Sequence, residues 1–413
     1  MELSSDHLLS REERLFRDAV REFAERHIAP VWVEIDEKGF IPPQLIARMA
    51  GQGLFAIPVP ERLGGQGGTV TEAAIAVREI ARADPAVATA VYTLLNNGWP
   101  MIASLFSNSG SVEELVRGVA AGKRFLGIAS TEPQGGSDVA SVRTRATAEG
   151  EGYRLEGEKT YISGVAEVME TLPEGGGWVT VARTGPEESG AKGISLIVVE
   201  ARRGGEKSPG IEYSRLDTIG RHGISTGILR FRGHWEPREK LLGEENNGMK
   251  IAMQGFNLAR ILVAAANIGS ALWALEQATG WARERLVFGE PLASKQAVAF
   301  RLAELTARLE AAWLLVLNAA RLADKIYVER DPTHSPRDLN TPAAMAKLEA
   351  PRTALEVYEE AMKLRGALSY TREDPLHRGW LGVTSYNVGA EGAENIMRYI
   401  IARNTIGRDY VKP

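Results

Sequence analysis

Apolar residues recur at helical spacing over the first part of the chain. In the first such segment they lie three or four positions apart until Pro30 ends the pattern. These apolar positions are Leu15, Phe16, Val20, Phe23, Ala24 and Ile28. Similar patterns follow over 44–55, 71–95 and 111–123, separated by turns and by a glycine-rich loop. The spacing therefore predicts an all-helical domain over residues 1–125.

The apolar spacing changes to strict alternation beyond residue 126. Ahead of the turn "EGEG", charged and polar residues alternate with Val142, Thr144, Ala146 and Ala148. This pattern is typical of a strand that enters a hairpin. More short apolar runs follow, separated by Gly and Pro. We therefore expect a small antiparallel β-barrel or sandwich over residues 126–238.

Helical spacing returns after residue 245 in four long segments, which predicts a four-helix bundle over residues 239–413. The segments are interrupted by "GEPL" and by two polar loops at 328–342 and 369–379. The predicted fold class is thus α+β, multidomain and mostly α. Its order is a helical domain, a small β domain and a helical bundle.

Composition restricts the possible functions. At 413 residues and 44% hydrophobic content, the chain is long enough to bury large cores in two or three domains. A net charge of −4 gives no sign of the basic surface that binds nucleic acid. The absence of cysteine excludes disulfides and thiolate chemistry. No two of the six histidines fall four residues apart, so we expect no metal site.

The amino-terminal residues are charged and lack the apolar stretch of a signal peptide. We also find no run of about 18 apolar residues of the kind that spans a membrane. These features predict a cytoplasmic protein without a membrane span, whose partners are small molecules or proteins.

Four ordered motifs give the sequence a family resemblance. Residues 127–138 read "GIASTEPQGGSD", and residues 155–164 read "LEGEKTYISG". Further along, residues 283–296 read "RERLVFGEPLASKQ" and residues 390–407 read "AEGAENIMRYIIARNTIG". In residue pattern, order and spacing, these stretches resemble the signatures of the acyl-CoA dehydrogenase family. A fifth stretch, "PERLGGQGG" at 60–68, is also similar to a family segment.

The resemblance implies FAD-dependent α,β-dehydrogenation of an acyl-CoA thioester to the 2-enoyl-CoA. Such a reaction needs a base for the α-proton and an acceptor for the β-hydride. By the motif match Glu391 is the base, and the flavin of FAD is the acceptor. Burial would raise the pKa of this glutamate and a nearby helix N-terminus would lower it, so both directions stay open. The alternative is a carboxylate that only favours the helix dipole.

The same motifs imply positions for cofactor and substrate. Contacts to the flavin are implied for Ile128, Thr131, Ser137, Tyr161 and Ser163. The resemblance also implies that the rest of FAD is held by Arg285, Phe288, Gln296 and Asn395. The first three match positions that contact FAD across a subunit interface. On the substrate side, the resemblance implies Ser137, Arg260, Ala390 and Gly392. A buried bundle arginine paired with a carboxylate is the alternative for Arg260.

The implied partners are an acyl-CoA, an electron-transferring flavoprotein or similar acceptor, and further copies of the chain. Members of this family form homotetramers more often than dimers, and both are expected candidates here. We expect no nucleic-acid partner. Two alternative functions stay open: an acyl-CoA oxidase that uses O₂, and a catalytically silent binding member of the same fold.

Several positions depart from the family pattern. Lys363 and Ala367 stand where the family has Gln and Gly, so the FAD contacts usually made there stay open. Ala390 stands where many members have Tyr, and the room it leaves favours a branched or cyclic acyl group. The longer stretch 166–177 is expected to be an exposed loop, at the substrate mouth. The helix predicted over 84–95 offers no cation, which disfavours a dicarboxylyl-CoA substrate.

Overall fold

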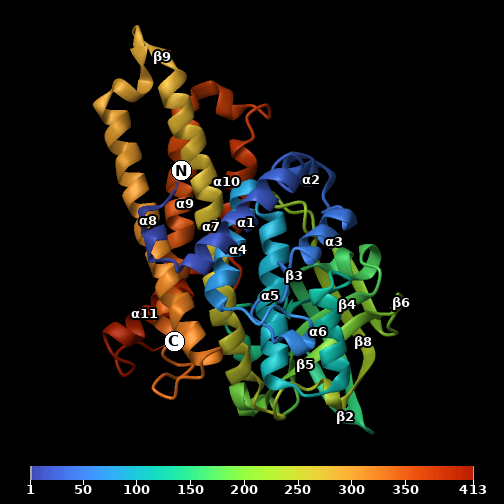
Figure 1. Cartoon of the computed structure of the whole chain (residues 1–413). Coiled ribbons are helices and arrows are strands. Elements are labelled where there is room, and N and C mark those ends of the chain that lie inside the picture. The colour runs from blue at the N-terminus through green and yellow to red at the C-terminus, as the bar shows by residue number, and fades with distance from the viewer. Residues whose placement is uncertain (1, 413) are drawn as a thin grey trace.

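The computed structural model describes residues 2–412 and places the C-terminal bundle beside the N-terminal helices, with a β-sheet beyond them (Figure 1). The N-terminal helices are α1 (Arg11–His27), α2 (Trp32–Lys38), α3 (Pro43–Gly51), α4 (Val70–Ala83), α5 (Ala88–Phe106) and α6 (Gly110–Ala120). Capping boxes start α1 and α4, in which Ser10 and Thr69 accept a backbone hydrogen bond. The helices predicted for this region are present.

The sheet follows α6 directly. Its strands are β1 (Arg124–Ala129), β2 (Arg145–Glu149), β3 (Gly152–Ser163), β4 (Gly175–Arg183), β5 (Ile194–Arg203), β6 (Glu206–Lys207), β7 (Ile211–Arg215) and β8 (Thr226–Pro237). The strand order is β6-β5-β4-β2-β3-β8-β7, with β1 also paired to β4. The hairpin predicted at "EGEG" joins β2 to β3.

The sheet is mixed rather than purely antiparallel, since β1 and β2 run parallel to β4. The whole β2–β3 hairpin lies between β1 and β4 in sequence, and a connection of this length allows parallel pairing. Alternation of apolar residues does not depend on strand direction, so the sequence pattern could not predict which strands run parallel. The overall order of helices, sheet and helices is confirmed.

The stretch 166–177 is not the exposed loop that the sequence predicts. Residues Glu167–Thr171 form a π-helical turn, in which Glu167 is buried. Its carboxylate accepts hydrogen bonds from the backbone N–H of Ser225 at 3.0 Å and from the Ser225 hydroxyl. The remainder enters β4, which is buried along its length. The prediction was wrong because the extra length of this stretch suggested a surface loop, whereas Glu167 has its hydrogen-bond partners inside the protein.

The C-terminal helices are α7 (Gly248–Glu284), α8 (Gln296–Tyr327), α9 (Asn340–Arg365), α10 (Leu376–Val388) and α11 (Glu394–Thr405). The fourth predicted segment is therefore divided into α10 and α11 by a break at 389–393. The short strands β9 (Leu286–Val287) and β10 (Glu290–Pro291) form a hairpin between α7 and α8, at the tip of the bundle (Figure 1).

Helix α7 is the core element on which the other parts pack. Among the described residues it is the one helix long and apolar enough to cross a membrane, but 94% of its apolar window is buried inside the protein. A Cβ added at Gly255 would lie 2.5 Å from the ring of Trp99 in α5. One added at Gly269 would lie 2.0 Å from the carbonyl oxygen of Arg78 in α4. These glycines let α7 approach both helices closely and thus fix one wall of the site described next.

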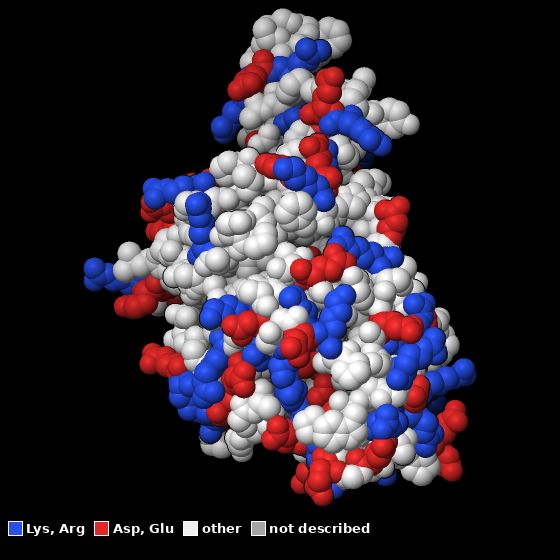
Figure 2. Space-filling model, turned by 90° about the vertical axis from the view of Figure 1, so that its right-hand side faces the viewer, with Lys and Arg blue, Asp and Glu red and all other residues white. Residues whose placement is uncertain are grey.

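The charged side chains on the face shown in Figure 2 are mixed in sign. Blue basic and red acidic groups lie side by side over its lower half. This face therefore carries no single-sign stripe of the kind that binds nucleic acid.

Candidate active site

A cavity of about 680 Å³ lies where the sheet meets α5, α7 and the segment 389–393. Its volume falls in the range of small-molecule and cofactor sites, roughly 300–1,000 Å³. The predicted site residues that line it are Ile128, Thr131, Ser137, Tyr161, Ser163, Arg260, Ala390, Glu391 and Gly392. Residues from separate motifs are thus brought together around one space.

Glu391 lies in the break between α10 and α11. Ala390 and Glu391 have φ angles of 51° and 53°, and Gly392 has a φ of 111°. Left-handed backbone is uncommon for a residue with a Cβ, and each such residue costs about 1–3 kcal/mol. The surrounding structure must therefore hold this turn in place.

Lys347 of α9 holds the turn at 389–393 through its side-chain ammonium group. Its Nζ donates hydrogen bonds to three carbonyl oxygens, those of Tyr386 at 2.8 Å, Gly389 at 3.2 Å and Gly392 at 2.6 Å. The side chain is buried. Carbonyls that lose their helical partners at the break are thus satisfied by a charged donor.

Arg260 of α7 holds the same turn from the side. Its Nε donates to the backbone carbonyl of Glu391 at 2.9 Å, and its Nη1 donates to the side-chain oxygen of Asn257 at 2.8 Å. Among the described residues no carboxylate forms an ion pair with this buried guanidinium. The alternative of a carboxylate-paired bundle arginine therefore does not describe it, and its contacts position the backbone of Glu391.

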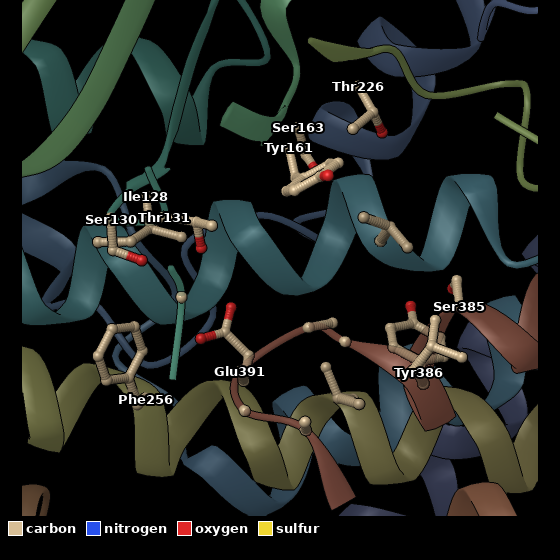
Figure 3. A pocket seen from close by; sticks show the side chains of 18 of the residues that line it. Ile128, Ser130, Thr131, Tyr161, Ser163, Thr226, Phe256, Ser385, Tyr386 and Glu391 are labelled. Carbon is tan, nitrogen blue, oxygen red and sulfur yellow. The ribbon is translucent and has the colours of Figure 1, made fainter. Parts of the chain in front are cut away.

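The Glu391 side chain points from the break into the cavity, toward the wall that carries Thr131 and Tyr161 (Figure 3). Burial raises the pKa of this carboxyl to about 7, although Arg260 and Lys347 act in the opposite direction. The sequence left the direction of this shift open. A carboxyl that titrates near neutral pH is suited to accept and release protons.

The opposite wall is made by an irregular part of β3. The pairing of β3 with β8 shifts register between Lys159 and Ile162, and Tyr161 lies in this bulge with a φ of 59°. The Tyr161 side chain lines the cavity and is 67% exposed. Bulges re-aim side chains, and this one directs an aromatic ring into the cavity.

A buried ion pair joins the loop after β1 to β3. Lys159 Nζ donates to Glu132 Oε1 at 2.7 Å and to the carbonyl oxygen of Ser130 at 3.1 Å. The same carboxylate accepts hydrogen bonds from the backbone N–H groups of Arg143 and Thr144. Burial opposes ionisation, yet Lys159 lowers the pKa of Glu132 to about 2. The glutamate of "TEP" and the lysine of "GEK" thus make two sequence motifs one structural unit.

Gly164, which follows Ser163 at the end of β3, has a steric reason to be glycine. Its φ is 83°, and an added Cβ would lie 2.5 Å from the ring of Phe125. Trp178 holds the backbone just before Gly164, because its Nε1 donates to the carbonyl oxygen of Ser163 at 3.0 Å. A side chain at 164 would displace this packing beneath Ser163.

Four predicted cofactor residues do not line the cavity. They are Arg285, Phe288, Gln296 and Asn395. Arg285 and Phe288 lie at the hairpin on the tip of the bundle, where Phe288 is 96% exposed (Figure 1). The departures at Lys363 and Ala367 are exposed as well. Since the roles predicted for Arg285, Phe288 and Gln296 involve a second subunit, a single chain does not test them.

Sequence reasoning missed several side chains that line or support the cavity, among them two cations, a threonine and a tyrosine. These four are Arg221, Thr226, Lys347 and Tyr386. For the lysine a signal was available, because Lys347 interrupts an alanine-rich stretch, "AAMAKLEA", on a core-facing helix. A lysine is rarely buried without a partner, so its position predicts an internal acceptor. The other three carry no sequence signal that marks them.

Comparison with known proteins gives matches over nearly the whole chain. Three family models match in order: acyl-CoA dehydrogenase N-terminal domain at 10–123, middle domain at 127–233 and C-terminal domain at 246–406. An acyl-CoA dehydrogenase of Bacillus subtilis is 33% identical over 406 residues, which cover 97% of this chain and 99% of that protein.

Two further relatives add a complex and a solved structure. The caffeyl-CoA reductase-Etf complex subunit CarC of Acetobacterium woodii is 31% identical, over 95% of this chain and 98% of that protein. The structure of butyryl-CoA dehydrogenase from Megasphaera elsdenii superposes with a TM-score of 0.86 at 28% identity, covering 98% of this chain and 100% of that one.

The first prediction concerns the protonation of Glu391. Because burial raises its pKa to about 7, the carboxyl should be protonated below that pH and ionised above it. Difference infrared spectroscopy should therefore show a protonated carboxyl band that disappears as the pH rises through about 7 and that is missing from Glu391→Gln. A band that disappears near the ordinary glutamate pKa of about 4.3 would contradict the account.

The second prediction concerns Lys347. Replacing Lys347 with Met removes the charged donor shared by three carbonyls, so the free energy of unfolding should fall by about 2–4 kcal/mol. Hydrogen exchange of the amides in 386–396 should accelerate. The exposed Lys325→Met on α8 is the matched control and should change neither quantity. Equal behaviour of the two variants would show that the ammonium does not hold the turn.

Proposed function

The chain belongs to the acyl-CoA dehydrogenase family, and from this premise we propose that it oxidises an acyl-CoA thioester to the 2-enoyl-CoA. One observation carries the proposal. The Glu391 carboxyl, with its raised pKa, extends into a cavity whose opposite wall bears the residues that match flavin positions. We assign the α-proton to this carboxylate.

The surroundings of Glu391 suit a base that works near neutral pH. Above a pH of about 7 the carboxyl is ionised and ready to accept a proton. Arg260 and Lys347 bind its own backbone and the flanking carbonyls, so the side chain is aimed by groups that do not neutralise it through a direct ion pair. A rigid turn of this kind limits the loss of orientation when substrate binds.

FAD is the cofactor of this family, and when bound it supplies the acceptor for the β-hydride. The residues present fit such a group. The exposed Tyr161 ring offers a flat apolar surface, and the hydroxyl-bearing residues Thr131 and Ser163 line the same wall. Lys363 lies in the last turn of α9 and Ala367 in the 3-10 turn that follows; both are exposed and neither lines the cavity.

We further propose that the electrons pass to an electron-transferring flavoprotein. The relative from Acetobacterium woodii is a subunit of a complex that contains such a protein, which supports this choice. Direct oxidation by O₂ is the competing possibility. The two differ in whether the reduced protein is reoxidised by air at the rate of turnover.

The tip of the bundle supports a homo-oligomer. Large apolar side chains exposed there or nearby are Leu286, Phe288, Phe300 and Tyr370. Phe288 and Tyr370 are each 96% exposed, which is unusual for aromatic rings on a monomer surface. We propose that this tip packs on a second copy, where Arg285 and Gln296 reach the remote part of FAD.

The third prediction tests the base. Glu391→Gln keeps the size of the side chain but cannot accept the proton, so flavin reduction by substrate should slow by about 10²–10⁴-fold or more while FAD stays bound. Anaerobic titration with straight, branched, cyclic and aromatic acyl-CoAs, followed at the visible flavin band, measures this. The nearby Glu394→Gln is the control and should be bleached like the wild type. Normal bleaching of Glu391→Gln would place the base elsewhere.

The fourth prediction tests the interface. Arg285→Ala should weaken FAD binding about 10-fold or more, the loss expected for a hydrogen bond from a charged group. Flavin fluorescence on dilution gives the dissociation constant. The exposed Arg283→Ala, two residues away, is the control and should bind FAD normally. Indistinguishable constants for the two variants would refute the predicted contact.

A further inference from the structure

Arg221 is a cation at the cavity that the proposed chemistry does not use. It lies in the connection between β7 and β8 and lines the cavity. The loop is wedged in place, because a Cβ added at Gly220 would lie 2.8 Å from Leu381 of α10, and one added at Gly223 would lie 2.8 Å from Ala88 of α5. The loop that carries Arg221 is therefore held against the start of α5, and Val91, one turn into that helix, also lines the cavity.

In the part of the chain that the structure describes, no acidic group lies within ion-pair distance of the Arg221 guanidinium. Nη2 of Arg221 donates to the hydroxyl of Thr226 at 3.3 Å. The charged residues that line the cavity are Arg221, Arg260 and Glu391, so cations outnumber carboxylates there. Arg260 is already engaged at the catalytic turn, which leaves Arg221 as the uncompensated charge.

A second unpartnered group lies beside it. The side chain of Tyr386, at the end of α10, lines the cavity and is 1% exposed, and its hydroxyl has no hydrogen-bond partner. Burial lowers the pKa of Arg221, and the nearby Tyr386 acts in the opposite direction. The arginine also adopts a φ of 51°, a conformation that side-chain-bearing residues avoid and that tends to persist at functional positions.

An apolar acyl chain would be a poor occupant of this end of the cavity. It would displace water from the guanidinium without replacing the lost hydrogen bonds, and a charged group is costly to leave unpaired. A carboxylate would accept hydrogen bonds from the guanidinium and neutralise its charge. The expectation of an uncharged acyl group rested on the helix 84–95 alone, whereas this cation comes from a loop of the sheet.

We propose that the acyl group of the substrate carries a carboxylate at its far end, which Arg221 binds. This inference rests on the proposed function for the identity of the thioester end. In the reaction the carboxylate is unchanged: the Cα–H bond breaks with its proton going to Glu391, the Cβ–H bond breaks with its hydride going to FAD, and a C=C bond forms. Arg221 thereby determines which acyl-CoA is accepted.

The test compares matched ligands on the FAD-loaded protein. Isothermal titration calorimetry measures the binding of ω-carboxyacyl-CoAs of increasing length against the same chains ending in a neutral carboxamide. At one chain length or more, the wild type should bind the carboxylate about 10- to 100-fold more tightly, as expected for hydrogen bonds to a charged group. Arg221→Gln should abolish this preference, and Arg221→Lys should restore part of it. Arg215→Gln, on the exposed strand before the loop, should behave like the wild type.

Three results would overturn the proposal. The wild type could bind the carboxylate and the carboxamide equally at every length. The preference could persist in Arg221→Gln. Alternatively, Arg221→Gln could weaken both ligands equally and shift the flavin spectrum, which would assign the guanidinium to FAD. Flavin bleaching in the same samples separates this inference from the proposed function. A carboxylate preference without bleaching would support the inference and reject dehydrogenation, and bleaching without a preference would do the reverse.

Discussion

The turn that carries Glu391 depends on one buried ammonium group, that of Lys347. At the break between α10 and α11 the backbone turns left-handed at Ala390 and Glu391, and a continuous helix would be easier to form. Lys347 offsets this cost by donating to three carbonyl oxygens, one near the end of α10 and two within the break. Arg260 adds a hydrogen bond to the carbonyl of Glu391 itself. The Glu391 carboxyl is therefore presented by backbone that two cations hold, and it forms no ion pair with either of them.

A buried cation also holds the opposite wall of the cavity. Lys159 is buried in β3 and binds both Glu132 and the carbonyl oxygen of Ser130, which keeps the loop after β1 against the strand. Directly beyond this pair, the β3 bulge directs Tyr161 into the cavity. In both walls an irregular stretch of backbone is paired with a buried cation. Irregular backbone aims side chains that regular helices and strands cannot, and it persists only where the surroundings satisfy its polar groups.

Much of the architecture could be predicted from the sequence because hydrophobic spacing reports secondary structure directly. The order of helices, sheet and helices followed from spacing alone, and the motifs brought Glu391, Tyr161 and Ser163 to the same cavity. What failed depends on tertiary partners. The parallel pairing of β1 with β4 leaves no trace in alternation, and the burial of Glu167 depends on a serine 58 residues away. Lys347 acts through contacts 39 to 45 residues away, and Arg221 lines the cavity from a loop outside every motif, so single-residue patterns could not assign their roles.

The most direct test of the account is a crystal structure of the protein with FAD and a non-oxidisable thioether analogue of an acyl-CoA. The account predicts that segment 389–393 keeps its broken, left-handed turn on Lys347. The carbon equivalent to Cα should lie about 3–3.5 Å from the Glu391 carboxylate, on the side that faces Tyr161. A continuous helix through 389–393, or an analogue bound with its thioether away from Glu391, would contradict the central claim.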